Sequence, residues 1–456
     1  MKHVGRQHVE SIAVIGAGSA GIAATKYLAA EPIFRRITVF EQRDTTGGMW
    51  NYTLDNSKAR FPTPVYDELE SNIPKELMAF SDLQFPQESQ LFATHETVLE
   101  YLRQYSKEVT PLIQFNTQVL EVAPVGASQW MVTTEQSGHE KVTESVFDAV
   151  VVANGHFETP LIPDLNGQTT WKRLYPDSIL HSLAFKNAAN FEHKKVIVVG
   201  PGASGTEIAS QLESVVQHPL IISKRSHTQD STSPPGRLTL PAIAELIPSS
   251  RSVRFVNGHL EHNIDHIILC TGYRCDYPFL RPFPTFYDGF CTRNLYRNIF
   301  YIPRPTLAFI AMPLKSVPFP LSESQAAVVA RVWANRLALP SQFAMSQWDD
   351  AFRLQYGGRK VSPLEAAHFN ISLMEGLYDW AVQATRQTSL INDGQGKLPA
   401  RWTERDIWLR ERLGPMKAAF TAHGSDRHRI RTPEELGFDF EQWKRDTGLC
   451  EPSRVL

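Results

Sequence analysis

Two short glycine-rich runs in this sequence have the spacing of turns that bind dinucleotide phosphates. Their glycines are Gly16, Gly18 and Gly21 in the first run and Gly200, Gly202 and Gly205 in the second. In such a G-x-G-x-x-G turn the first glycine permits a tight bend, the second lets backbone N–H groups approach a pyrophosphate, and the third brings helix and strand close together. Because the motif occurs twice, we expect two dinucleotide cofactors in one chain.

A charged residue after each motif indicates which nucleotide the motif binds. Glu41 follows Gly21 by 20 positions, and Arg225 follows Gly205 by the same 20 positions. An acid at this offset accepts hydrogen bonds from a free ribose, whereas an arginine accommodates a 2′-phosphate. The first motif is therefore expected to bind FAD and the second, with Lys224 beside Arg225, NADPH. The alternative for these two basic residues is an ordinary exposed pair.

The segments around each motif are the ones that such a turn needs. Residues 12–15 predict a buried parallel strand, residues 20–30 predict a helix, and a second strand at 37–40 ends at the acid. The corresponding segments of the second motif are residues 195–200, 203–217 and 220–223. Each motif thus lies between a strand and a helix, as dinucleotide binding requires.

The rest of the chain predicts an α/β fold with two Rossmann-like domains and a helical C-terminal elaboration. Further strands are expected at residues 114–122, 129–134, 147–153, 265–270 and 307–312, and further helices at 99–107 and 323–337. A proline-rich turn precedes the last of these helices, and the chain from residue 340 is expected to pack on the FAD half. We expect an FAD-binding domain in residues 1–165 and 277–456, interrupted by an inserted NADPH-binding domain at residues 166–276.

Length and composition favour a soluble enzyme. The 456 residues suffice for two or three domain equivalents. A net charge of −2 gives no field that attracts nucleic acid or an acidic membrane surface. No apolar run approaches the length of a membrane span, and four cysteines do not make a disulfide framework, so we expect a cytoplasmic protein. We expect the basic cluster at residues 427–431 to be a solvated loop.

Six segments, in order along the chain, resemble motifs of the flavin-containing monooxygenases of the soluble microbial or fungal kind. They read FEQRDTTGGMWNYT (residues 40–53), YDELESNIPKELMAFSD (66–82), LFATHETVLEYL, GPGASG, CTGYRCDYPFL and TLAFIAMPLKSVPFPLSESQAAVVAR. The resemblance covers at least residues 11–385. It implies that NADPH reduces FAD, that dioxygen adds at flavin C4a, and that the hydroperoxide passes one oxygen to a nucleophilic nitrogen or sulfur of a small molecule. In that scheme the cofactors supply the difficult chemistry, and the protein orients them.

The resemblance also implies roles for individual residues. Asn72 falls where the family keeps an asparagine beside the flavin and the nicotinamide, and an amide can donate one hydrogen bond while accepting another. The alternative is a turn residue before Pro74. Ser71 is expected to contact the nicotinamide nucleotide, and Met49 and Trp50 to pack on the flavin. The further expected cofactor contacts are Ser19, Ala20 and Gln42 for FAD, and Ser204, Gly205, Thr206 and Glu207 for the NADP phosphates.

One stretch departs from the family. The family's identifying run, Phe-x-Gly-x-x-x-His-x-x-x-Tyr or Phe, corresponds here to Tyr175, Asp177, His181 and Phe185. Aspartate in place of glycine brings the local linker geometry into question, and we assign His181 no catalytic role. Phenylalanine rather than tryptophan at position 185 argues against the related Baeyer–Villiger enzymes.

Two other functions stay open at this stage. One is a Baeyer–Villiger monooxygenase acting on a ketone, and the other is a flavin-binding protein without turnover. We expect no metal, because His259 and His262 have no third ligand nearby in the sequence. Cys270 and Cys275 fit a buried small residue and a loop thiol better than a redox pair. The expected partners are an amine or thioether substrate and dioxygen, without nucleic acid or membrane, and a homodimer is compatible with the sequence.

Overall fold

The first glycine motif follows a strand in the middle of a seven-stranded sheet. A computed structural model describes residues 8–138, 141–225, 236–280, 283, 293–312, 316–356 and 363–448, without the side chains of residues 356 and 363–366. The strand order in this sheet is β18-β19-β20-β7-β1-β2-β3. Its strands are β1 Ser11–Ile15, β2 Arg36–Phe40, β3 Ile113–Gln114, β7 Ala149–Val152, β18 Leu295–Tyr296, β19 Phe300–Tyr301 and β20 Leu307–Phe309. Neighbours from β20 to β3 run parallel, whereas β18, β19 and β20 pair antiparallel.

β1 and β7 form the buried middle of this sheet. Every residue of β7 is buried, and so is every residue of β1 after Ser11. Ile12 of β1 aligns with Ile37 on one side and with Ala149 on the other. Parallel strands are covered on both faces, which explains why β1 and β7 are unbroken apolar runs in the sequence.

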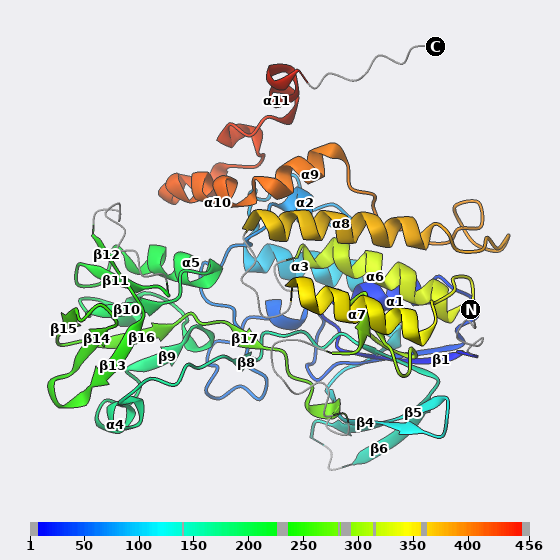
Figure 1. Ribbon diagram of the computed structural model, residues 1–456, viewed down its shortest axis with the longest axis horizontal. Coiled ribbons are helices and arrows are strands. Elements are labelled where there is room, and N and C mark those ends of the chain that lie inside the picture. Colours follow the sequence, from blue (N-terminus) through cyan, green and yellow to red (C-terminus); the bar gives the residue numbers. More distant parts are fainter. Residues whose placement is uncertain are drawn as a thin grey trace. The chain divides into compact units, whose positions relative to one another are not determined.

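Helices cover one face of the seven-stranded sheet, and a small antiparallel sheet lies on the other face (Figure 1). The helices are α1 Ser19–Ala29, α3 His95–Ser106, α6 Pro318–Trp333, α7 Gln342–Tyr356 and α8 Pro363–Ala381. The small sheet consists of β4 Thr117–Val125, β5 Gln129–Gln136 and β6 Val142–Phe147. Helices α1 and α6 pack against each other, and Tyr27, Ala327 and Trp333 belong to the hydrophobic core between helices and sheet.

The chain after residue 402 forms what we call the C-terminal segment, residues 403–448. It contains α9 Glu404–Glu411, α10 Leu413–Ala422 and α11 Phe440–Thr447. A capping box between Thr403 and Asp406 starts α9. Apolar side chains of this segment share a buried cluster with Leu91 and Phe92; they include Trp408, Leu409, Met416, Phe420, Ile430 and Phe440. The predicted helical C-terminal elaboration is confirmed, and none of the described helices has both the length and the apolar composition needed to cross a membrane.

The second glycine motif follows a strand of a five-stranded parallel sheet. The order in this sheet is β12-β11-β10-β16-β9. Its strands are β9 Ile179–His181, β10 Val196–Val199, β11 Leu220–Ser223, β12 Arg237–Leu240 and β16 His266–Leu269. The elements around it are α4 Gln168–Leu174, α5 Ala203–Leu212, the antiparallel strands β13 Ile243–Ile247, β14 Ser252–Phe255 and β15 Leu260–Glu261, and the pair β8 Thr159–Pro160 and β17 Tyr273–Arg274. The predicted α/β class with two Rossmann-like sheets is confirmed.

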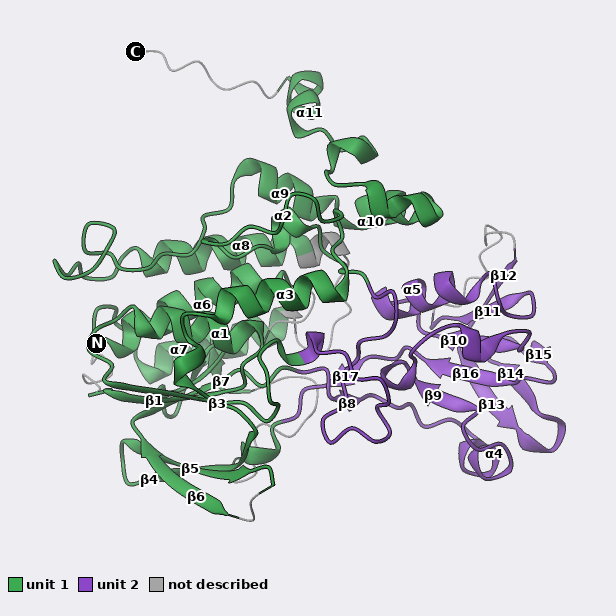
Figure 2. Cartoon of the chain, turned by 180° about the vertical axis from the view of Figure 1, so that it is seen from behind, with its two compact units in different colours: residues 1–48, 70–155, 277–456 green, residues 49–69, 156–276 purple. Residues whose placement is uncertain are grey.

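The chain divides into two compact units (Figure 2). Unit 1 comprises Met1–Gly48, Glu70–Gly155 and Tyr277–Leu456, and unit 2 comprises Met49–Leu69 and His156–Asp276. Residues 49–69 belong to unit 2 through hydrogen bonds such as Lys186 Nζ to the Val65 carbonyl at 2.7 Å. These boundaries divide the chain into compactly packed units. The boundaries of the FAD-binding and NADPH-binding domains stay a prediction.

Several elements differ from the sequence-based expectation. The helix expected at 203–217 ends at Leu212, where the chain turns toward β11. The helix expected at 323–337 begins earlier, at Pro318, because proline is well suited to the first helical turn, where its missing N–H costs nothing. The strand expected at 147–153 is divided at Asp148, whose carboxylate accepts from the Ser11 N–H at 2.9 Å. Residues 313–315 of the expected proline-rich turn lie outside the described residues.

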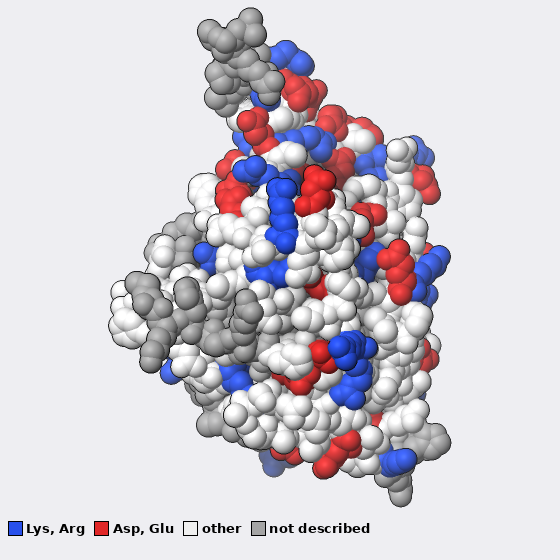
Figure 3. Space-filling model, turned by 90° about the vertical axis from the view of Figure 1, so that its right-hand side faces the viewer, with Lys and Arg blue, Asp and Glu red and all other residues white. Residues whose placement is uncertain are grey.

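Charged side chains of both signs are interspersed on the face that Figure 3 shows. Most of that face is formed by uncharged residues, and the Lys and Arg on it occur among Asp and Glu, in line with the net charge of −2.

Candidate cofactor sites and active-site turn

The first and third glycines of the unit 1 motif are required by the protein itself. Gly16 has φ +100°, and a Cβ added there would lie 2.7 Å from the Ala153 carbonyl oxygen. A Cβ on Gly21 would lie 1.9 Å from the Gly16 carbonyl oxygen. Both approaches are closer than any real contact, so strand, turn and helix fit together only with glycine at these positions.

The middle glycine of each motif has a different explanation. Gly18 and Gly202 have φ of −77° and −75°, which any residue can adopt. A Cβ on Gly18 would make only an ordinary contact, 3.5 Å from Gly48 Cα, and a Cβ on Gly202 would meet no atom of the described chain within 4 Å. The protein does not need glycine there. The open space fits a pyrophosphate that approaches the backbone closely.

The helices that follow the two motifs begin with unused N–H groups. Gly18 and Gly202 are the N-cap residues of α1 and α5, and neither helix start has a side-chain cap among the described residues. The first N–H groups of a helix lack intrahelical partners, and the helix dipole makes this end positive. Both starts therefore fit a phosphate, which would supply the missing acceptors.

Glu41 lies at the first motif, as the offset predicted. Its carboxylate is only 4% exposed and accepts from the Ala17 N–H at 2.7 Å and from the Arg43 N–H at 2.9 Å. These two contacts place the acid directly against the glycine-rich turn. A carboxylate can accept up to roughly four hydrogen bonds, so its position fits one that also accepts from a ribose.

The second site repeats this geometry with the opposite charge. Gly200 has φ +101°, and a Cβ on Gly205 would lie 1.8 Å from the Gly200 carbonyl oxygen. The hydroxyl groups of Ser204 and Thr206, in the first turn of α5, form no hydrogen bond within the described chain. Arg225 is exposed just after β11. The charge difference between the two sites thus persists in the structure.

Glu207 differs from the other residues expected near the NADP phosphates. Its carboxylate lies near the buried Tyr66, and burial together with this negative charge raises the pKa of the Tyr66 hydroxyl. A carboxylate does not attract a phosphate. The structure therefore favours a role for Glu207 in holding residues 49–69 against α5.

Asn72 lies on a turn of residues 70–73, which we call the Asn72 turn, just before α2 Lys75–Met78. The Asn72 side chain is exposed and has no hydrogen-bond partner among the described residues. The backbone around it is held firmly, since Ser71 N–H donates to the Ala93 carbonyl and Lys75 N–H to the Leu91 carbonyl, both at 2.8 Å. A fixed backbone thus presents an amide that the protein does not use.

Ser71, Trp50 and Met49 lie in surroundings that the sequence did not indicate. Ser71 is 2% exposed, and its hydroxyl donates to the Ile73 carbonyl at 2.8 Å, so it shapes the turn. Trp50 packs against a unit 2 cluster that contains Phe185. Met49 and Trp50 are grouped with unit 2 rather than with the first motif. The contacts of these residues with nicotinamide or flavin stay predictions.

The departure from the family's identifying run has a structural explanation. Asp177, where the run has glycine, adopts φ +62°. Aspartate tolerates this left-handed region better than most residues, so the backbone keeps the shape that glycine would give it. His181 accepts from the Leu183 N–H at 3.1 Å, and its other ring nitrogen lies 2.9 Å from the Gly272 carbonyl oxygen. Burial lowers the pKa of His181, in keeping with a structural histidine.

The residues set aside from the sequence have ordinary surroundings. Neither Cys270 nor Cys275 forms a disulfide among the described residues, and burial raises the pKa of Cys270 to about 12, which makes it a poor nucleophile. His259 pairs with Glu261 at 2.7 Å. Among the described residues, no group of three His, Cys, Asp or Glu side chains has the arrangement of a metal site.

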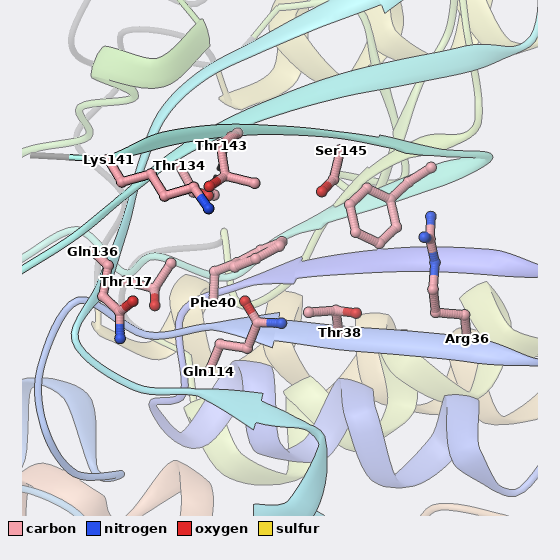
Figure 4. A pocket seen from close by; sticks show the side chains of 11 residues that line it. Arg36, Thr38, Phe40, Gln114, Thr117, Thr134, Gln136, Lys141, Thr143 and Ser145 are labelled. Carbon is pink, nitrogen blue, oxygen red and sulfur yellow. Dashed lines mark hydrogen bonds between the residues drawn. The ribbon is translucent and has the colours of Figure 1, made fainter. Parts of the chain in front are cut away.

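A hollow of about 440 Å³ lies between β2–β3 and the small sheet (Figure 4). Its lining consists of Arg36, Thr38, Phe40, Gln114, Thr117, Thr134, Gln136, Lys141, Thr143, Ser145 and Phe147. None of the predicted site residues lines it. Arg36 already donates to the Val146 carbonyl and lies over the Phe147 ring, 4.3 Å from its centroid. We assign the hollow no role in the cofactor chemistry proposed below.

Several residues that hold the Asn72 turn, or the chain that follows it as far as Ser81, could not be found from the sequence. Glu323 in α6 is fully buried and accepts from both the Ser81 N–H and the Ser81 hydroxyl at 2.8 Å, and burial raises its pKa. Lys417 donates to the Ser71 carbonyl at 3.0 Å. Arg427, expected in a solvated loop, instead places Nε 2.9 Å from Glu70 Oε1. These partners are hundreds of residues apart in sequence, so no local spacing could reveal them.

Known proteins share both the sequence and the architecture. A family model described as flavin-binding monooxygenase-like matches residues 9–229 and 240–354. The thiol-specific monooxygenase of Saccharomyces cerevisiae is 32% identical over 349 residues, which cover 73% of this chain and 79% of that protein. The structure of S-allyl-L-cysteine S-oxygenase from Allium sativum has a TM-score of 0.78 and 25% identity and covers 98% of this chain and 99% of its own. A cyclohexanone monooxygenase structure shares the fold more distantly, with a TM-score of 0.55 and 17% identity over 82% of this chain and 97% of its own. The chain belongs to the flavin-binding monooxygenase-like family, and it is an oxidoreductase that uses FAD and NADPH.

Proposed function

We propose that this monooxygenase transfers one oxygen atom from O₂ to a sulfur nucleophile of a small molecule, either a thiol or a thioether. NADPH supplies two electrons and the sulfur supplies two, so that one oxygen atom joins the sulfur and the other leaves as water. Sulfur is the atom named for two similar proteins, the thiol-specific monooxygenase of yeast and the S-allyl-L-cysteine S-oxygenase. We therefore favour sulfur over the nitrogen of an amine.

The observation that carries the proposal is the pair of open glycine turns with opposite charges after them. The turn at Gly18, with Glu41 beside it, fits FAD. The turn at Gly202 fits the pyrophosphate of NADPH, and Arg225 fits its 2′-phosphate. Bound FAD would supply the redox and oxygen chemistry. The chain's own residues would orient the two cofactors. Electron transfer from NADPH to FAD explains why one chain has two such turns.

Asn72 is the residue that we propose acts at the reacting atoms. Its exposed amide can donate to an oxygen atom without transferring a proton, which a carboxylic acid or an ammonium group would do. The backbone hydrogen bonds of Ser71 and Lys75 fix the direction in which the amide points. Such a pre-positioned neutral donor favours oxygen transfer over release of hydrogen peroxide.

The two alternatives have less support. A Baeyer–Villiger reaction would fit a tryptophan at position 185, whereas Phe185 here is buried against Tyr66, with ring centroids 5.4 Å apart. A binding protein without turnover would need neither the exposed Asn72 amide nor a charge for the 2′-phosphate.

Product analysis of a mixed substrate panel tests the function. Purified enzyme would be incubated with NADPH, air and matched thiols, thioethers, tertiary amines and ketones, and the products identified by mass spectrometry. We expect S-oxygenated products with NADPH consumed in proportion. Lactone or ester products from ketones would favour the Baeyer–Villiger reaction, and oxygenation of amines alone would contradict the preference for sulfur.

Replacing Asn72 with aspartate tests the role of its amide. The carboxylate keeps the size of the side chain but can no longer donate a hydrogen bond. We expect Asn72→Asp to oxidise NADPH at a rate near that of the wild type while releasing hydrogen peroxide instead of sulfoxide, measured by a peroxidase-coupled assay. A variant that still couples NADPH to product would show that Asn72 has another role.

We also propose a cytoplasmic location and a homodimer. Cys270 and Cys275 form no disulfide among the residues that the structure describes, and this fits a reducing compartment. Cell fractionation tests the location. Light scattering of the purified protein tests the dimer, and a monomer mass would contradict it.

A further inference from the structure

Two basic residues of the C-terminal segment contact the Asn72 turn. Lys417, on α10, donates to the Ser71 carbonyl at 3.0 Å and lies 3.4 Å from Glu70 Oε2. Arg427 places Nε 2.9 Å from the other oxygen of Glu70. The turn that carries Asn72 is therefore held by a part of the chain that follows it by more than 300 residues.

The polar contacts are partly shielded from water. Glu70 is 8% exposed, and the side chain of Lys417 is 19% exposed. The Lys417 ammonium also lies over the Phe92 ring, 4.6 Å from its centroid, and Gln90 donates to Glu70 Oε1 at 3.1 Å. A charge-assisted hydrogen bond in such surroundings is stronger than one on an open surface.

The C-terminal segment reaches the same region at further points. Leu91 N–H donates to the Ile430 carbonyl at 2.8 Å, and Arg405 pairs with Glu76 of α2. The buried cluster of Leu91 and Phe92 with the C-terminal helices adds an apolar contact. The family model ends at residue 354, so this support comes from outside the region that the model matches.

We infer that Lys417 is a positioning residue for Asn72. By holding the Ser71 carbonyl next to it in the chain, and by holding Glu70 together with Arg427, Lys417 fixes the direction of the Asn72 amide and so keeps NADPH oxidation coupled to oxygenation. The inference rests on the proposed role of Asn72. It gives the C-terminal segment a role in coupling NADPH oxidation to oxygenation, in addition to its packing within unit 1.

Lys417→Met tests the inference, because methionine keeps most of the apolar stem and removes the ammonium. The matched control is Lys444→Met, since Lys444 lies in the same segment, pairs with Glu404 at 3.1 Å and contacts the Phe440 ring, but does not reach the Asn72 turn. We expect Lys417→Met to lower the ratio of oxygenated product to hydrogen peroxide about tenfold, the loss expected for one charge-assisted hydrogen bond. The KM for NADPH should stay unchanged, and Lys417→Arg should restore most of the coupling.

Hydrogen–deuterium exchange provides a readout that does not depend on turnover. In Lys417→Met the peptide that spans residues 66–80 should exchange faster than in the wild type, and in Lys444→Met it should not. Unchanged exchange together with unchanged coupling would overturn the inference. If Lys417→Met does not yield flavin-loaded protein, Arg427→Gln replaces it with the same expectations, and an unchanged result there overturns the inference equally.

A double-mutant cycle separates this inference from the proposed role of Asn72. If Lys417 acts through Asn72, Lys417→Met should add little uncoupling to that of Asn72→Ala. Additive effects would show that Lys417 acts elsewhere and overturn the inference. If Asn72→Ala itself stays coupled, the proposed role of Asn72 fails, and the exchange experiment still decides whether Lys417 holds the turn.

Discussion

Replacing Gly202 with alanine separates what the protein needs from what its nicotinamide cofactor needs. Gly202 has φ −75° and ψ −175°, a conformation that alanine adopts without strain. The added Cβ would meet no atom of the described residues within 4 Å. The methyl group would therefore disturb none of the described residues, and an effect on cofactor kinetics would point to a ligand.

The expected effects on stability and binding differ widely in size. Alanine is a poorer N-cap than glycine, but it also restricts the unfolded chain, which stabilises by roughly 0.4–1 kcal/mol. These contributions offset each other, so we expect the free energy of unfolding to change by less than about 1 kcal/mol. A pyrophosphate pushed away from the start of α5 would lose at least one charge-assisted hydrogen bond of roughly 1.5–3 kcal/mol. That loss corresponds to a rise in the KM for NADPH of roughly 10- to 150-fold.

The assay pairs thermal unfolding in the absence of NADPH with the kinetics of NADPH oxidation. Gly414→Ala is the matched control, because a Cβ on Gly414 in α10 also meets nothing within 4 Å in the part of the chain that the structure describes. It should stabilise by roughly 0.5–1 kcal/mol, as expected for alanine within a helix, and leave the KM for NADPH unchanged. Gly205→Ala should not fold, since its Cβ would lie 1.8 Å from the Gly200 carbonyl oxygen.

Two results would refute this reasoning. A Gly202→Ala enzyme with normal KM would show that the pyrophosphate does not approach α5. A variant that loses stability as Gly205→Ala does would show that the protein itself requires glycine at position 202.

Three further substitutions test other parts of the structure. Arg225→Ala should raise the KM for NADPH roughly tenfold or more by loss of a charge-assisted contact while leaving NADH kinetics unaltered, and equal effects on both cofactors would place the 2′-phosphate elsewhere. Asp177→Val should destabilise by about 1–2 kcal/mol in urea unfolding because φ is +62°, whereas Asp177→Gly should be tolerated, and equal stability of the two variants would contradict the role of the left-handed backbone. Burial raises the pKa of Glu323 above 4.5, so the stability that its protonated form contributes is present below that pH and lost as the pH rises. The Tm of Glu323→Gln relative to the wild type should therefore rise between pH 5 and pH 8, and a constant difference would show that the buried carboxyl does not titrate in this way.

The parts of the fold that local sequence controls could be predicted. The β1 strand, its glycine turn and α1 follow from a β-branched run, glycines at fixed spacing and a helix-forming stretch, and all three lie within one or two residues of the prediction. Glu41 could be placed because the turn and the second strand have nearly constant lengths in this kind of unit. Its contact with Ala17 at 2.7 Å follows from that geometry.

Long-range contacts could not be predicted in the same way. Neither Lys417 nor Glu70 has a local pattern that indicates the other, because their contact depends on how α10 packs on residues 91 and 92. The start of α6 at Pro318 was missed for a different reason. Prolines near one another suggest a turn, yet the first helical turn accepts them equally well.

Oxygen-isotope labelling tests the oxygenase chemistry most directly. The enzyme would be supplied with NADPH, ¹⁸O₂ and a small thioether, and the product analysed by mass spectrometry alongside NADPH consumption. We predict a sulfoxide that carries one ¹⁸O atom for each NADPH oxidised. An unlabelled sulfoxide, or NADPH oxidation that ends entirely in hydrogen peroxide with every thiol, thioether and amine tried, would contradict the proposed oxygen transfer.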